Sequence, residues 1–191
     1  MPRAGLSAAA VTDIAIAIID DEGVEALTLT AVAKRAGVAA PSLYKHVRSV
    51  ADLHDHVAAH VVAEMRERLA AAVMGRSLDD ATRALMRAYR DYVISYPNRY
   101  AVFPQAPPRN PDLAAAADRL LDVALALLRG YGLEGTQAVH AARCLRSVAH
   151  GFASLQAAGA FELPENLDIS YDYLTGMLTD GIARIAADQA A

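Results

Sequence analysis

The chain has 191 residues, of which 54% are apolar and 21% are charged, a composition that supports a folded core and argues against intrinsic disorder. Its net charge of −4 argues against a protein coated in nucleic acid, although a local basic patch would still permit DNA binding. The single cysteine, Cys144, cannot form an internal disulfide, and no signal peptide or membrane-spanning run is evident, so we expect a cytoplasmic protein without a membrane partner.

The first predicted helix lies between Ser7, which suits an N-cap, and Gly23, which ends it. Apolar residues recur at helical spacing from Val11 to Ile19, as expected for a helix with one buried face. Arg3 precedes this helix and could act as a short basic arm or belong to a disordered terminus.

A second short helix, about residues 29–36, has Thr28 or Thr30 as its cap. Gly37 follows where a left-handed residue would end the helix, and Pro41 suits the first turn of a third helix. Two short helices joined by about four residues that include a glycine have the geometry of a helix-turn-helix. Spacing alone fits a three-helix bundle with a solvated basic edge equally well.

The residues of this segment follow a more specific pattern. Thr28 precedes the helix end VAKRAGV at 32–38, the short helix LYKH follows at 43–46, and Leu53 lies at the opening of a long helix. Over about the first 65 residues this pattern closely resembles the N-terminal DNA-binding domain of the tetracycline-repressor (TetR) family of bacterial transcription regulators. The resemblance implies that the third helix enters the major groove of DNA.

The resemblance and the side-chain chemistry together predict the residues that contact DNA. Phosphate contacts give affinity and register, whereas contacts to base edges give sequence specificity. Small side chains permit a close approach to the groove, and Lys45 could read guanine. The predicted DNA-binding residues are Thr28, Lys34, Arg35, Ala39, Ala40, Pro41, Ser42, Tyr44, Lys45, His46 and Arg48.

A long helix is predicted from about Val50 to Met74, with Ser49 as its cap. One face of it carries a stripe at four-residue spacing, formed by Asp52, His56, His60 and Glu64. Two histidines at this spacing could chelate a metal, but the H-E-x-x-H order is missing and no cysteine is near. We interpret the stripe as the solvated face of a connector helix, and we expect no metal and no cofactor.

Five further helices are predicted over about residues 78–96, 98–103, 110–131, 136–158 and 170–187. The middle one is apolar on most sides, which predicts a central buried helix. The fold class is therefore all-α with about nine helices. We expect a helix-turn-helix domain over residues 1–50, a connector helix over 50–74, and a C-terminal ligand-binding and dimerisation domain over 51–191.

The residues from Gly130 to Gly135 match the G-x-G-x-x-G pattern of dinucleotide-binding loops. In such loops the pattern follows a β-strand inside a βαβ unit, whereas here it follows a predicted helix. We therefore interpret it as a helix stop and a turn between helices.

The helix over 136–158 combines a polar stripe with an apolar one. The polar stripe could line a ligand site, or it could be a partly solvated face or a subunit interface. Residues 147–152, SVAHGF, resemble the W-H-G signature of one class of TetR-family ligand domains, with Ala149 in place of the tryptophan. The predicted ligand-contacting residues are Met86, Tyr89, Tyr92, Tyr96, Phe103, Leu121, Leu125, Arg143 and His150.

The last two helices are amphipathic and contain small residues that suit close packing. In the TetR family such a pair meets its two-fold mate in a four-helix bundle, so the resemblance implies a homodimer. The predicted dimer-interface residues are Leu145, Val148, Phe152, Leu174, Leu178 and Ile182.

These observations predict a sequence-specific transcriptional regulator that is not an enzyme. The expected mode of action is ligand-responsive repression by a homodimer on a pseudo-palindromic DNA operator. Its partners would be double-stranded DNA and a small-molecule effector. A helical enzyme is an alternative, although spacing places no nucleophile, base and orienting residue together. A small-molecule-binding or dimerisation protein without DNA contact is another.

Overall fold

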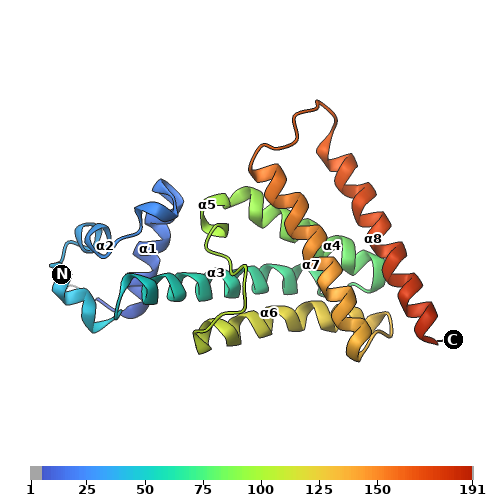
Figure 1. Ribbon diagram of the computed structural model, residues 1–191, viewed down its shortest axis with the longest axis horizontal. Helices are drawn as coiled ribbons and strands as arrows, with labels where there is room; N and C mark the ends of the chain where they lie inside the picture. Colours follow the sequence, from blue (N-terminus) through green and yellow to red (C-terminus); the bar gives the residue numbers. More distant parts are fainter. Residues whose placement is uncertain (1–5, 191) are drawn as a thin grey trace. The chain divides into compact units, whose positions relative to one another are not determined.

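The computed structural model describes residues 6–190, so Arg3 lies outside the described part of the chain. Within this range the chain forms eight α-helices and two 3-10 helices and contains no strand, which confirms the all-α fold class (Figure 1). Two compact units are each built from two stretches of sequence. The first consists of Met1–Val62 with Tyr96–Ala117, and the second of Ala63–Ser95 with Asp118–Ala191. Each unit is therefore discontinuous in sequence, whereas the predicted domains are continuous and meet at residue 50.

The first unit contains the short elements around the predicted DNA-binding segment. They are α1 (Ala8–Glu22), the 3-10 helix η1 (Val24–Ala26), α2 (Leu29–Ala36), the 3-10 helix η2 (Ala40–Lys45), α5 (Pro97–Tyr100), and the first parts of α3 (Val50–Val73) and α6 (Pro111–Gly130). The Ser7 hydroxyl accepts a hydrogen bond from the Ala10 N–H at 3.1 Å, which confirms Ser7 as the N-cap of α1. The core of this unit includes the fully buried side chains Val11, Ile19, Val32, Leu43, Val47 and Leu53.

The second unit is a bundle of longer helices. It contains α4 (Leu78–Ser95), α7 (Gly135–Ala157) and α8 (Leu167–Ala190), with the remaining parts of α3 and α6. α4 packs against both α7 and α8. The Tyr171 hydroxyl of α8 is buried and donates a hydrogen bond to the Met86 carbonyl of α4 at 2.7 Å, which ties these two helices together.

The predicted third helix differs from the structure, because η2 is a 3-10 helix of six residues. Pro41 lacks an amide donor, and the element ends at Lys45, before His46, whose φ of −120° is not helical. The His46 N–H donates to the Leu43 carbonyl at 2.8 Å, an i→i+3 bond that suits a short segment. The segment therefore forms a tight turn of helix between α2 and α3.

The prediction that α6 is a central buried helix is wrong for the described chain. Its buried side chains are limited to Leu113, Ala116, Leu127 and Leu128. Leu121 is 47% exposed, and it lies among the exposed residues Asp118, Arg119 and Asp122. Charged side chains in this stretch keep one side of α6 in solvent, because burying them without partners would be costly.

The glycine-rich segment behaves as the predicted turn. α6 ends at Gly130 and α7 begins at Gly135. Gly132 has a φ of 79°, and the N–H of the fully buried Leu133 donates to the Leu128 carbonyl at 3.2 Å. This left-handed turn ends one helix and redirects the chain into the next, and no β-strand precedes it in residues 6–190, as a dinucleotide-binding loop would require.

Candidate nucleic-acid interface

The beginning of α2 presents a capped helix end to solvent. The Thr28 hydroxyl oxygen accepts a hydrogen bond from the Ala31 N–H at 3.0 Å, so Thr28 is the cap and Thr30 is not. Thr28 is exposed, and its hydroxyl hydrogen can still donate outward. The first amides of α2 also carry the positive end of the helix dipole. A DNA phosphate would find complementary donors here.

The turn after α2 fixes where the next element points. Gly37 has a φ of 67°, and its N–H donates to the Lys34 carbonyl at 3.2 Å. The Val38 N–H donates to the Ala33 carbonyl at 3.1 Å, which completes a Schellman-type helix end. Leu43, in the middle of η2, is completely buried and holds that element against the core. The opposite side of η2 is consequently turned outward.

The outward side of the turn and of η2 carries most of the predicted DNA-reading residues. Tyr44 is 61% exposed. Ala39, Pro41 and Lys45 are exposed, and Ala40, Ser42 and His46 are partly exposed. The Ser42 hydroxyl donates to the Ala39 carbonyl at 2.6 Å, so its oxygen is left mainly as an acceptor. These side chains share one short accessible segment.

Two of the four basic residues in this region are ion-paired with acids that flank it. The Arg35 Nη2 lies 2.5 Å from the Asp21 Oδ2 of α1. The Arg48 Nη2 lies 2.6 Å from the Asp52 Oδ1 of α3. Although residues 27–50 contain no acid, the folded chain brings acids from both sides. These two arginines therefore offer less charge to a phosphate than the sequence predicts.

The two lysines of the region differ from the arginines. Lys34 and Lys45 are both exposed. Among the residues described, no carboxylate lies within ion-pair distance of either ammonium group. Their charges are therefore the ones most available to a phosphate or to a guanine edge.

The residues predicted to contact a ligand do not all belong to one unit. Tyr96 and Phe103 belong to the first unit, where Phe103 stacks on Tyr100 with ring centroids 5.2 Å apart. Leu121 and Arg143 lie in the second unit but are exposed. Both side chains face solvent in the single chain, and their assignment to a ligand stays a prediction.

The other predicted ligand contacts include three buried side chains of α4, namely Met86, Tyr89 and Tyr92. The Tyr92 hydroxyl donates a hydrogen bond to the Glu64 Oε2 of α3 at 3.0 Å. These residues fit the packed core of the second unit as well as they fit a ligand site. Their assignment to a ligand stays a prediction.

His150 of α7 is partly exposed, as is Leu125 of α6. The His150 Nδ1 lies 3.3 Å from the Ser154 hydroxyl. Burial lowers the pKa of His150 below its ordinary value, and the nearby charge of Arg146 lowers it further. Both effects favour the neutral form of His150, in which one ring nitrogen can donate and the other can accept.

Arg90 is a polar residue of the core that the sequence analysis did not identify. It is 9% exposed, and it donates hydrogen bonds to Gln156 Oε1 and Asp168 Oδ1, both at 2.7 Å. Its guanidinium lies over the rings of Tyr171 and Phe152, at 4.9 and 5.6 Å from the centroids. Helical periodicity on α4 could have revealed it, because position 90 falls on the same buried face as Met86.

Three of the predicted dimer-interface residues lie in the core of the chain itself. Leu145, Leu178 and Ile182 are buried, so their side chains are already covered by neighbouring helices. Burial within the single chain disfavours a contact with a second subunit at these positions, and their assignment to the dimer interface stays a prediction. Val148, Phe152 and Leu174 are partly exposed.

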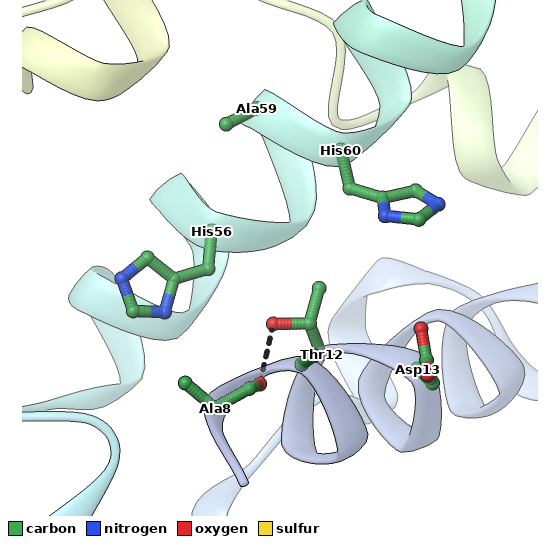
Figure 2. Close-up of a pocket in the computed structure, with 7 residues that line it drawn as sticks. Ala8, Thr12, Asp13, His56, Ala59 and His60 are labelled. Carbon is green, nitrogen blue, oxygen red and sulfur yellow. Dashed lines mark hydrogen bonds between the residues drawn. The ribbon is translucent and has the colours of Figure 1, made fainter.

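The histidines of the α3 stripe border a pocket of about 360 Å³ between α1 and α3. Figure 2 shows His56 and His60 on α3 above Thr12 and Asp13 on α1, with the Thr12 hydroxyl donating to the Ala8 carbonyl. The pocket lining is mainly apolar, and three of its seven residues are alanines. Within residues 6–190, no three His, Cys, Asp or Glu side chains are placed so that they could hold a metal ion.

Two family models match the chain. Residues 11–57 match the model described as bacterial regulatory proteins of the tetR family, and residues 82–178 match a tetracyclin repressor-like C-terminal domain. An uncharacterized HTH-type transcriptional regulator of Mycobacterium tuberculosis is 35% identical over 96% of this chain and 82% of its own length. Another, YobS of Bacillus subtilis, is 33% identical over 93% of this chain and 95% of its own length.

Solved structures resemble the whole chain in fold. BioQ with its double-stranded DNA operator has a TM-score of 0.68 and 19% identity, covering 94% of this chain and 99% of that one. A TetR variant of Acinetobacter baumannii in complex with minocycline has a TM-score of 0.64 and 20% identity, covering 96% of both chains. Over the stretch that the structure describes, no helix combines the length and apolar character needed to cross a membrane.

Proposed function

This chain belongs to the TetR family of bacterial regulatory proteins and is a DNA-binding transcriptional regulator, and we propose that it acts as a ligand-responsive homodimeric repressor in the cytoplasm. Members of this family are regulators and not enzymes. The observation that carries the proposal is the exposed η2 segment, which is anchored from beneath by Leu43 and preceded by the capped helix α2.

In the proposed complex, η2 lies in the major groove and the beginning of α2 lies against a phosphate. Small residues of the turn, such as Ala39, permit a close approach of the backbone to the base edges. Lys45 is suited to donate to guanine O6 and N7, and Tyr44 to donate to a phosphate. Lys34 adds a second cation at the edge of the contact.

A single copy of this interface would bind DNA weakly. The unpaired cations are few, and each phosphate contact contributes only part of the affinity. Two copies on one two-fold axis would read half-sites whose centres lie about 34–36 Å apart or a multiple of that distance. Dimerisation is therefore part of the proposed mechanism.

The proposed dimer surface is the exposed apolar face of α8, which replaces the buried positions predicted from sequence. Ile169, Tyr173 and Met177 follow one another at four-residue spacing and are 54%, 71% and 65% exposed. Leu155 of α7 is also exposed. Apolar faces of this kind are stabilised when a second copy covers them.

The proposed effector is a small, partly apolar molecule that binds within the second unit, near Met86, Tyr89 and Tyr92. The minocycline complex of the TetR variant supports this idea by likeness of fold only. For regulation, the effector must bind one arrangement of the dimer more tightly than the arrangement that fits the operator.

The test begins with the full-length wild-type protein and a pool of random duplexes. Repeated selection and sequencing should yield a pseudo-palindrome, and the protein should bind it with an affinity that falls steeply as salt is raised. Adding metabolite or drug extracts to the same gel shift then searches for the effector. Selection of no sequence, or equal binding of scrambled duplexes, would contradict sequence-specific DNA recognition.

A further inference from the structure

The C-terminal end of α1 has an unusual charge. Asp20, Asp21 and Glu22 are consecutive, and they occupy the last turn of the helix. The helix dipole is negative at this end, and the acids also repel one another, so the arrangement is unfavourable without positive partners. The folded chain supplies such partners from two different elements.

The first partner is α5, which lies far away in sequence but belongs to the same compact unit. The Arg99 Nε donates to the Asp20 Oδ1 at 3.1 Å, and its Nη2 donates to the Asp20 Oδ2. The Asn98 side-chain amide donates to the Asp20 carbonyl at 3.2 Å. That carbonyl is among the last four of the helix, which have no partner inside it. α5 therefore caps α1 in two ways, because the Arg99 side chain pairs with the Asp20 carboxylate and the Asn98 side chain donates to the Asp20 backbone carbonyl.

The geometry of Arg99 is itself fixed by its surroundings. Its guanidinium lies 4.6 Å from the centroid of the Tyr96 ring, and its side chain is only 15% exposed. The paired carboxylate of Asp20 is 30% exposed. Ordering an arginine that is held over a ring costs less side-chain entropy than ordering an exposed one. Because this arginine is shielded from water, its ion pair is also screened less.

The second partner lies in α2, directly before the turn that leads to η2. Arg35 is in the last turn of α2, two residues before the left-handed Gly37, and it pairs with Asp21 at 2.5 Å. Its Nη1 is also 4.0 Å from Glu22. The acidic end of α1 is thus bonded to α5 on one side and to the end of α2 on the other.

We propose that Arg99 is a positioning residue for DNA recognition, which holds the end of α1, and through it the end of α2, in the arrangement that reads the operator. The proposal rests on the proposed role of η2 as the DNA-reading element. Without Arg99, Asp20 is left unpaired beside two other acids, and the end of α1 adopts further arrangements. The apparent affinity for the operator then falls with the fraction of molecules that keep the binding arrangement.

The experiment uses the full-length protein and the duplex that the wild-type protein selects from a random pool. Operator Kd values are measured by fluorescence anisotropy for Arg99→Ala, Asp20→Asn and the double variant. Arg87→Ala is the matched control, because Arg87 also pairs with an aspartate of another helix, Asp172, at 3.0 Å, but in the second unit. A stoichiometric titration with excess protein counts the active molecules, and circular dichroism follows thermal unfolding.

We expect Arg99→Ala and Asp20→Asn each to raise the operator Kd by about 10-fold, within the usual range of coupling between sites. The double variant should lose no more than either single one, since both remove the same contact. Exchanging the charges, with Asp20→Arg and Arg99→Asp together, should recover most of the affinity. Arg99→Lys keeps the charge without the paired N–H groups, and it serves as the second variant if Arg99→Ala does not fold.

Two results would overturn the positioning role while leaving DNA binding intact. One is an unchanged operator Kd in the folded Arg99 variants, with fewer active molecules as the only change. That result would mean that Arg99 contributes to folding and not to the arrangement that binds DNA. The other is an equal loss in Arg87→Ala. Selection of no duplex by the wild-type protein would instead contradict the proposed function itself.

Discussion

Asp52 holds Arg48 at three points, at the junction between η2 and α3. The Arg48 backbone N–H donates to the Asp52 Oδ2 at 2.8 Å, and its Nε and Nη2 donate to the Oδ1 at 3.1 and 2.6 Å. The Asp52 N–H in turn donates to the Ser49 hydroxyl at 3.0 Å, which confirms Ser49 as a capping residue of α3. These hydrogen bonds hold the link after η2 against the beginning of α3, in addition to any contact that Arg48 makes with DNA.

Replacing Asp52 with Asn should weaken this junction. We expect the operator Kd to rise by about 5-fold, because the link between η2 and α3, which contains Arg48, gains freedom that binding must remove. Asp55→Asn, one turn further along α3, should leave the Kd unchanged. Anisotropy titrations of both variants check the prediction, and equal affinities for Asp52→Asn and the wild type would contradict it.

The stabilising effect of Asp52 should depend on pH in a defined direction. The hydrogen bond from the Arg48 side chain lowers the pKa of Asp52 below the ordinary value of 3.8. A carboxyl with a lowered pKa stabilises the fold at every pH above the unfolded value, and this stabilisation disappears as pH falls through the folded one. The difference in Tm between wild type and Asp52→Asn should therefore be constant near neutrality and shrink below about pH 4. A difference that grew on acidification would contradict this sign.

The two lysines without carboxylate partners should have separable effects on DNA binding. If Lys45 contacts a guanine, Lys45→Ala should cost about 1–3 kcal/mol of binding free energy and relax specificity at one base pair. Lys34→Ala should weaken binding to all duplexes alike and reduce the salt slope by about one. Titrations at several salt concentrations distinguish the two, with Arg129→Ala on the exposed surface of α6 as control. Unchanged binding and salt slopes in both lysine variants would exclude η2 as the reader.

Arg90 should be important for stability, because it bonds to α7 and α8 from the middle of α4. Arg90→Ala removes two hydrogen bonds and two ring contacts from a buried site, and we expect a loss of about 1–3 kcal/mol in the free energy of unfolding. Arg87→Ala breaks an exposed pair and should cost less than about 1 kcal/mol. Denaturant melts compare the two, and equal losses would show that burial of Arg90 does not matter.

The exposed face of α8 should be required for the proposed dimer. Met177→Glu places a charge on that face, so we expect monomers in analytical ultracentrifugation and weak operator binding, with the helical spectrum retained. Met74→Glu is the matched control, since Met74 is 78% exposed at the end of α3. A Met177→Glu protein that stays dimeric would place the subunit contact elsewhere.

Short-range features were predictable because they depend on neighbouring residues. Ser7 and Thr28 cap their helices with their hydroxyl oxygens. Gly37 adopts the left-handed conformation that ends α2. η2 was expected as a short helix and is a 3-10 helix, because a six-residue segment with a proline at its second position is too short for i→i+4 bonding to dominate.

Which face of each long helix is covered was much less predictable. An apolar stripe can pack within the chain or against a second copy, and periodicity is the same in both cases. Leu178 and Ile182 of α8 are buried inside the chain, whereas Tyr173 and Met177 are exposed, although all four are possible interface residues by composition. The same ambiguity explains the incorrect expectation for α6.

Composition, local spacing and family pattern established an all-helical regulator with a helix-turn-helix near its N-terminus, since each depends on residues close together in the chain. The charge available to DNA was decided only by the tertiary structure. Arg35 reaches Asp21 across 14 positions, and Arg99 reaches Asp20 across 79 positions. No periodic pattern predicts such pairs, because they form only after packing has brought separate elements together.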